Sequence, residues 1–161
     1  MPSFNLINSS IFIGNVHSVI GNYATQDEDI LDILQINTVI SALSEEEYED
    51  YMLGKEDLTN IDWHRLVVDD DEEERISIHF FDVHKIIRDA VSDGKNVMVH
   101  CAAGISRSAT LVIAYLMIEN GWTMREAYNY VKNKRHIIEP NIGFMKQLQG
   151  LEYKLKQYRK I

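Results

Sequence analysis

The stretch that most constrains the fold is residues 96–110, NVMVHCAAGISRSAT. The apolar run at 97–99 is typical of a short buried strand, and the apolar run at 108–118 is typical of a buried helix. Residues 101–107 would then form the turn between them. In such a strand-turn-helix, the N–H groups of the loop and of the first helical turn converge on one point, where the helix dipole adds positive charge. The stretch therefore predicts an anion site at the start of a buried helix.

The residue types in this turn fit chemistry on a phosphate group. Cys101, the only cysteine, lies at the base of the turn, where the N–H groups would hold it as the nucleophilic thiolate. Gly104 allows a tight turn, and Arg107 offers a planar fork suited to two phosphate oxygens. The structural alternative is a buried, inert cysteine. It leaves the spacing of Gly104, Arg107 and Ser108 unexplained.

Length and composition favour one domain. The chain has 161 residues, of which 45% are hydrophobic, enough for one core over residues 1–161. A single cysteine cannot form an internal disulfide, no N-terminal apolar run precedes a small-residue cleavage site, and no apolar run approaches about 18 residues. We expect a soluble monomer located in the cytoplasm and also in the nucleus.

Charge is divided unevenly along the chain. The net charge is −9, yet residues 1–75 hold 18 acidic and 3 basic side chains, whereas residues 76–161 hold 7 acidic and 13 basic. The basic half contains the predicted phosphate loop, which suits an anionic substrate. The acidic half argues against nucleic acid or an anionic membrane as the main partner.

Strands and helices alternate along the sequence. Strands are predicted at residues 11–13, 38–41, 63–68 and 97–99, and helices at 25–35, after Ser44, at 76–91, at 108–118, after Thr123 and from Pro140 to Tyr158. Three helix starts carry a capping box: Thr25 with Glu28, Ser44 with Glu47, and Thr123 with Glu126. The pattern predicts a single α/β domain with a central, mostly parallel mixed sheet of about five strands flanked by helices.

A general acid is needed as well, because an alkoxide or phenoxide leaves poorly at neutral pH. Asp69, Asp70 and Asp71 directly follow the predicted strand at 63–68. Their carboxylates would therefore lie at a strand's carboxyl end, where open α/β sheets build their sites. From position alone, all three are candidates.

The string HCAAGISRS, residues 100–108, resembles the signature of the cysteine-dependent protein phosphatases. Similarity to the dual-specificity phosphatases extends over most of the chain, from residues 11–15 to 140–144. Gly121-Trp122, residues 126–132 and residues 144–148 are similar to the slingshot-type cofilin phosphatases and the MAP kinase phosphatases. The resemblance implies a compact, atypical dual-specificity phosphatase with a protein-tyrosine-phosphatase-like fold, without the additional domains of those enzymes.

The resemblance also implies roles for individual residues. The family's acid aspartate precedes the helix by six residues, which selects Asp70, with Asp69 and Asp71 still open. Ser108 would help the sulfur leave in the second step, although a helix N-cap is the alternative. His100 would orient the loop and Asn141 would support the site, but the residues alone favour an N-cap for Asn141. The phosphate-binding residues would be Ala102, Ala103, Gly104, Ile105, Ser106 and Arg107.

The implied activity is metal-independent hydrolysis of phosphotyrosine and of phosphoserine or phosphothreonine through a phosphocysteine, with no cofactor and a phosphoprotein as partner. The spacing of His79 and His84 predicts no metal site. The uncharged loop 102–106 favours protein over phosphoinositide substrates. The alternatives are a phosphoresidue-binding pseudophosphatase or scaffold, and a phosphatase for a non-protein phosphomonoester.

Overall fold

A computed structural model describes residues 2–20, 30–52 and 60–159. Its centre is a five-stranded sheet in the order β1-β2-β5-β3-β4. The strands are β1 (Phe4–Leu6), β2 (Ile11–Gly14), β3 (Ile36–Leu43), β4 (Asp62–Val67) and β5 (Asn96–His100). Only β1 and β2 pair antiparallel, whereas β2, β5, β3 and β4 run parallel. The prediction of a mixed, mostly parallel α/β sheet is confirmed.

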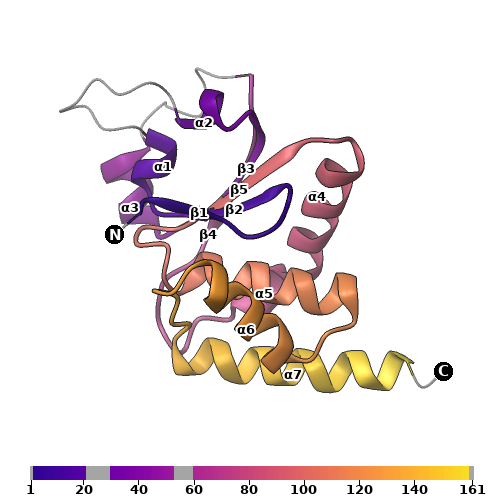
Figure 1. The fold of residues 1–161 in the computed structure, drawn as a ribbon. Coiled ribbons are helices and arrows are strands. Elements are labelled where there is room, and N and C mark those ends of the chain that lie inside the picture. Colours follow the sequence, from indigo (N-terminus) through magenta and orange to yellow (C-terminus); the bar gives the residue numbers. More distant parts are fainter. Residues whose placement is uncertain (1, 21–29, 53–59, 160–161) are drawn as a thin grey trace.

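Helices cover both faces of the sheet (Figure 1). One group comprises α1 (His17–Ile20), α2 (Ile30–Ile33) and α3 (Glu45–Tyr51). The other comprises the 3₁₀ helix η2 (Ile76–His79), α4 (Phe80–Ser92), α5 (Arg107–Asn120), α6 (Met124–Lys134) and α7 (Ile142–Arg159). Adjacent strand residues alternate between two hydrophobic clusters: Val39 and Met98 pack in one, Ile40 and Val99 in the other.

Most predicted elements are present, but the four-residue helix α1 was not predicted, and two further differences lie among the described residues. The predicted helix at 76–91 begins as a 3₁₀ turn and becomes α-helical only at Phe80, a common way for a helix to start. The strand β1 was not predicted, because three residues are too few to show a period. The capping boxes at Ser44 and Thr123 are formed, whereas Thr25 and Glu28 lie outside the described residues.

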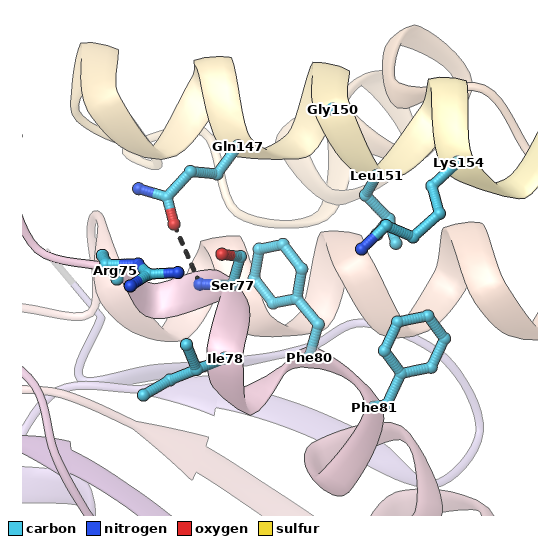
Figure 2. Close-up of a pocket in the computed structure, with 9 residues that line it drawn as sticks. All are labelled: Arg75, Ser77, Ile78, Phe80, Phe81, Gln147, Gly150, Leu151 and Lys154. Atoms are coloured by element: carbon cyan, nitrogen blue, oxygen red, sulfur yellow. Dashed lines mark hydrogen bonds between the residues drawn. The ribbon is translucent and has the colours of Figure 1, made fainter.

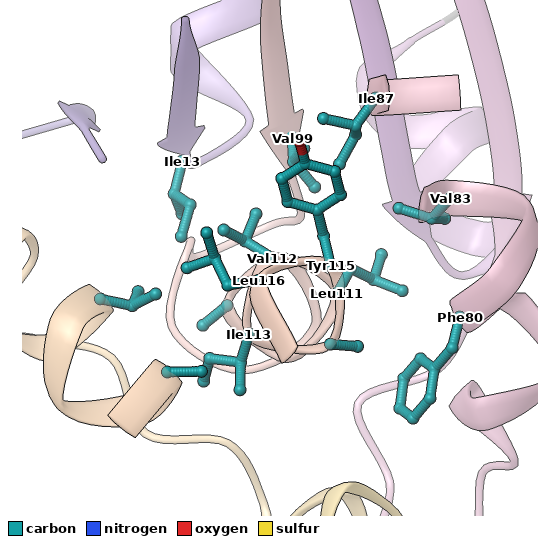
Figure 3. Close-up of a cluster of buried hydrophobic side chains, with 14 of the residues drawn as sticks. Ile13, Phe80, Val83, Ile87, Val99, Leu111, Val112, Ile113, Tyr115 and Leu116 are labelled. Atoms are coloured by element: carbon teal, nitrogen blue, oxygen red, sulfur yellow. The ribbon is translucent and has the colours of Figure 1, made fainter. Parts of the chain in front are cut away.

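Helix α5 is the centre of the larger hydrophobic cluster. Every residue from Arg107 to Met117 is buried. Figure 3 shows this helix end-on, with Ile13 and Val99 approaching from the sheet and Val83 from α4. Helices α6 and α7 also pack against α5. A helix held on all sides fixes the loop that precedes it, and that loop is residues 101–106.

Across residues 2–20, 30–52 and 60–159, no helix combines the length and the apolar content that crossing a bilayer requires.

Candidate active site

The loop 101–106 leaves the carboxyl end of β5 and enters α5 directly. Its carbonyl oxygens at Ala102, Gly104 and Ile105 accept hydrogen bonds from outside the loop. The donors are Val16 N–H (3.1 Å), Arg135 Nε (2.8 Å) and Glu139 N–H (2.8 Å). Because these carbonyl groups are tied outward, the loop is held with its N–H groups available on the other side.

The N–H groups of residues 102, 103, 105, 106 and 107 have no acceptor within the described part of the chain. The N–H of Gly104 donates to Cys101 Sγ at 3.2 Å. Gly104 has a φ of 67°, and a Cβ there would lie 2.6 Å from Arg135 Nη2 and 2.8 Å from the Gly14 backbone. Only glycine fits this position. The result is a nest of N–H donors around the sulfur, which suits an anion.

Cys101 is 2% exposed, at the bottom of this nest. Its Sγ lies 3.2 Å from Ser108 Oγ, within hydrogen-bond distance for sulfur. Ser106, not Ser108, occupies the N-cap position of α5, and Ser108 lies inside the first turn. The N-cap alternative for Ser108 is therefore wrong, and its hydroxyl faces the sulfur.

Arg107 is held by Glu47. Its Nη1 and Nη2 donate to the two carboxylate oxygens at 2.6 and 3.1 Å, and Nη1 also donates to the Val68 carbonyl at 2.9 Å. Nε is buried and has no partner among the described residues. A guanidinium carries five N–H groups, so three are engaged, while Nε–H and one N–H of Nη2 remain. These two lie along one edge, the arrangement that binds two phosphate oxygens.

In the Glu47–Arg107 pair, the surroundings favour the charged form of both side chains. Burial by itself would raise the pKa of Glu47, but hydrogen bonds from Arg107 and from Ser44 lower it to about 2. Burial would lower the pKa of Arg107, yet the bond to Glu47 and the negative charges of Cys101, Glu47 and Asp70 raise it. Arg107 is thus a fixed cation beside Cys101.

His100 is neutral, because full burial lowers its pKa from 6.5 to about 4. Its Nδ1 lies 3.2 Å from the Cys101 carbonyl oxygen, which can only accept, so Nδ1 carries the proton. Nε2 then accepts the hydroxyl proton of Ser41, 2.6 Å away. These two hydrogen bonds connect Ser41 on β3 to Cys101, the first residue of the loop. Among the described residues, both ring nitrogens of His100 are thus engaged with Ser41 and Cys101.

The three aspartates differ in their surroundings. The Asp71 carboxylate accepts the Glu73 N–H at 2.8 Å, a bond within its own turn. At Asp69, it is the backbone N–H that donates to Glu74. The Asp70 carboxylate instead accepts from Asn141 Nδ2 at 3.0 Å. Of the three, only Asp70 bonds to a residue that also contacts the loop.

Asn141 makes that connection with three groups. Its Oδ1 caps α7 by accepting the Phe144 N–H at 2.9 Å, so the predicted N-cap is present. Its backbone N–H donates to Ser106 Oγ at 3.0 Å, and its Nδ2 donates to Asp70. One residue therefore fixes the distance between the aspartate loop and the phosphate loop.

Two contributors were missed from sequence. Glu47 was assigned only to the capping box of α3, and nothing local signals its ion pair with Arg107, 60 residues away. Arg135 is 1% exposed and bonds the loop at Gly104 O and the N-terminal segment at Asn5 Oδ1. Burial lowers the pKa of Arg135. Residues 132–135, Lys-Asn-Lys-Arg, gave no sign that Arg135 is in the core.

Known proteins with similar sequences and structures are phosphatases or phosphatase-like proteins. Residues 19–154 match the family model described as "Dual specificity phosphatase, catalytic domain". Dual specificity protein phosphatase 1 of Arabidopsis thaliana is 33% identical over 149 residues, which are 92% of this chain and 68% of that protein. Human Slingshot homolog 1 is 44% identical over 90 residues, 56% of this chain and 9% of that protein.

Among solved structures, the human tyrosine phosphatase-like serine/threonine/tyrosine-interacting protein superposes with a TM-score of 0.81 at 28% identity. The match covers 96% of this chain and 97% of that one. The sequence matches cover less: 60% of a relative from Invertebrate iridescent virus 6, besides the 9% of Slingshot homolog 1. The chain thus spans less than two thirds of these two relatives.

Proposed function

The chain belongs to the dual-specificity phosphatase catalytic-domain family, and on that premise we propose that it hydrolyses phosphoprotein monoesters through a phosphocysteine. The observation that carries the proposal is the loop after Cys101, in which the Gly104 N–H donates to Sγ, the other N–H groups have no acceptor among the described residues, and Nε of Arg107 is buried without a partner there. It offers a nucleophile and anion donors at one point.

In the first step, the Cys101 thiolate attacks phosphorus as the bond to the substrate oxygen breaks. The N–H groups of loop 102–107 and the Nε–H edge of Arg107 bind the nonbridging oxygens, on which charge is distributed in the transition state. Glu47 holds Arg107 from its opposite edge, so the cation needs no rearrangement to meet the phosphate. Asp70 gives its proton to the departing oxygen.

In the second step, water attacks the phosphocysteine and Asp70 accepts its proton. The sulfur leaves as thiolate, helped by a hydrogen bond from the Ser108 hydroxyl 3.2 Å away. Inorganic phosphate is released, and Asp70 is again the acid. Asp70 is preferred to Asp71 because it bonds to Asn141 beside the loop, whereas the Asp71 carboxylate is engaged in its own turn.

A panel of phosphorylated substrates tests this function. Phosphotyrosine and phosphothreonine peptides, a phosphoinositide and a phosphorylated sugar are compared in the presence of a metal chelator. We expect both peptides to be hydrolysed and the phosphoinositide to react much more slowly, because loop residues 102–106 offer no cation for further phosphates. Preference for the lipid or the sugar would contradict a protein substrate.

A phosphoresidue-binding module is the second candidate, because the structural relative described above is named phosphatase-like and interacting. That description applies to the relative. Here Cys101, Arg107 and an aspartate joined to the loop are all present, which favours turnover. Tight phosphopeptide binding by folded, reduced wild-type protein without hydrolysis would support the binding module instead.

A further inference from the structure

A groove lies between η2–α4 and α7, outside the phosphate loop (Figure 2). Its volume is about 550 Å³. The residues that matter for its chemistry are Arg75, Ile78, Phe81, Gln147, Gly150 and Lys154. Ile78 and Phe81 are 63% and 47% exposed. Apolar side chains that share an open groove are typical of interaction surfaces.

The groove is preformed by contacts across its floor. The Gln147 side chain accepts the Ser77 N–H at 2.9 Å (Figure 2). It also donates to the Glu74 carbonyl at 2.8 Å. One turn earlier in α7, Gly143 packs so closely on the Glu72 backbone that a Cβ there would overlap it. The loop that carries Asp70 therefore rests on the start of α7, and the groove continues from this loop along α7.

Gly150 gives a second, independent indication of a ligand. It lies within the 18-residue helix α7, where glycine is destabilising relative to alanine. A Cβ at Gly150 would have no heavy atom of the described residues within 4 Å, so none of these residues requires glycine there. The missing side chain leaves the wall of the groove open. Gly150 also lines a smaller neighbouring hollow together with Tyr153, which is 69% exposed.

The charges of the groove define the chemistry of its occupant. Arg75 and Lys154 line it, and neither forms an ion pair or a side-chain hydrogen bond with the described part of the chain. Among residues 2–20, 30–52 and 60–159, no carboxylate lines it. The acidic residues nearest in sequence are engaged elsewhere: Glu74 accepts from Asp69, and Asp82 lines a separate hollow with Lys85. Glu152 accepts from the Met124 N–H and from Lys156. The groove is thus apolar and cationic in a chain of net charge −9.

We propose that this groove docks a second segment of the phosphoprotein substrate, one with an apolar side chain flanked by carboxylates. The proposal rests on the proposed function, since the docked segment and the phosphoresidue belong to one chain. With the phosphoresidue at Cys101, the substrate passes the Asp70 loop and reaches the groove. Binding there acts equally on ground and transition states, so it lowers KM and leaves kcat unchanged.

The test uses synthetic phosphotyrosine peptides with one neutral core. A glycine-serine linker joins the core to a tail of Glu-Phe-Glu-Leu, in one series at the N-terminal side and in another at the C-terminal side. Matched tails replace both glutamates by lysine, or the two apolar residues by alanine. We expect the acidic apolar tail of one series to lower KM about tenfold, equivalent to about 1.4 kcal/mol. The matched tails should have little effect.

Four variants test the location. Gly150→Trp fills the groove and Lys154→Glu reverses its charge, so both should abolish the gain in KM. Gly150→Ala should keep the gain and raise the melting temperature. Lys156→Glu is the matched charge control, because Lys156 bonds to Glu152 on the same helix and does not line the groove. All four should hydrolyse the bare core peptide at the wild-type rate.

Each contrary result has a separate meaning. A lysine tail as good as the glutamate tail, or a gain that survives Gly150→Trp, would overturn the docking site. A wild-type dimer that Gly150→Trp dissociates in sedimentation velocity would assign the groove to a second copy. If the bare core is not hydrolysed, the proposed function fails instead. A fluorescently labelled tail without phosphate, titrated by anisotropy, then still tests the groove, and absence of binding overturns it.

Discussion

Glu47 gives the sharpest prediction about stability, because one carboxylate serves both the capping box of α3 and Arg107. Glu47→Gln keeps the size and one acceptor oxygen but removes the charge. In the Glu47→Gln protein, Arg107 would keep a weaker hydrogen bond to the one remaining acceptor oxygen. The Arg107 side chain is only 7% exposed, so its charge would stay buried. A buried cation that loses its counter-ion is strongly destabilising.

The magnitude follows from the pKa of Glu47, which falls from 4.5 to about 2 on folding. At about 1.36 kcal/mol per unit, the charged form contributes about 3 kcal/mol at neutral pH. Because the folded pKa is the lower one, this contribution is complete above pH 4.5 and is lost as the pH falls toward 2. The gap between wild type and Glu47→Gln should narrow to about 2 kcal/mol at pH 3.5.

Urea unfolding of both proteins at several pH values measures this gap. Glu46→Gln is the matched control, since Glu46 is exposed on the same helix and its loss should change stability by less than about 0.5 kcal/mol. Glu47→Gln should also lower kcat/KM about tenfold or more, because Arg107 loses its fixed orientation. Equal stability of the two variants, or a gap independent of pH, would refute the ion-pair reasoning.

Three other positions give further predictions. Asp70→Asn should slow esters with poor leaving groups far more than activated aryl esters, which hardly need a proton, and Asp71→Asn should change neither rate more than about twofold; the reverse order would move the acid to Asp71. The pKa of His100 is lowered from 6.5 to about 4, so the unfolded chain binds more protons in that range and wild-type stability should fall as the pH drops from 6.5 to 4, by up to about 3 kcal/mol. His100→Asn should flatten this slope in urea unfolding, and an unchanged slope would place the titrating group elsewhere. Ser108→Ala should slow only the second step, seen as a burst of aryl leaving group followed by slow turnover; a uniform loss without a burst would contradict its role at the sulfur.

The sequence predicted those parts of the fold that local patterns encode. The apolar run at 97–99 and the capping boxes at Ser44 and Thr123 led to elements within a few residues of the observed ones. Strand β1 could not be found, because its three residues are defined by pairing with β2 and not by their own composition. The 3₁₀ start at Ile76 shares its apolar spacing with an α-helix, so spacing cannot separate the two.

In the site, too, the residues that a local motif contains were predicted, and those that depend on tertiary contacts were not. Cys101, Gly104 and Arg107 lie in one continuous stretch, the loop 101–106 and the first residue of α5, and their spacing identifies them. The partners of that loop come from distant parts of the chain and depend on tertiary packing: Glu47 on α3 holds Arg107, and Arg135 after α6 holds the Gly104 carbonyl. The sequence around Glu47 indicates only a helix cap, and the lysines before Arg135 indicate only an exposed helix end.

The most direct test of the central claim is detection of the phosphocysteine itself. The Ser108→Ala protein is mixed with an aryl phosphate and a metal chelator, quenched in acid during turnover, and analysed by peptide mass spectrometry. We predict one phosphoryl group on the peptide that contains Cys101, and none when Cys101→Ser is introduced as well. Steady turnover with no phosphate on Cys101, or turnover that persists in the Cys101→Ser protein, would contradict the account.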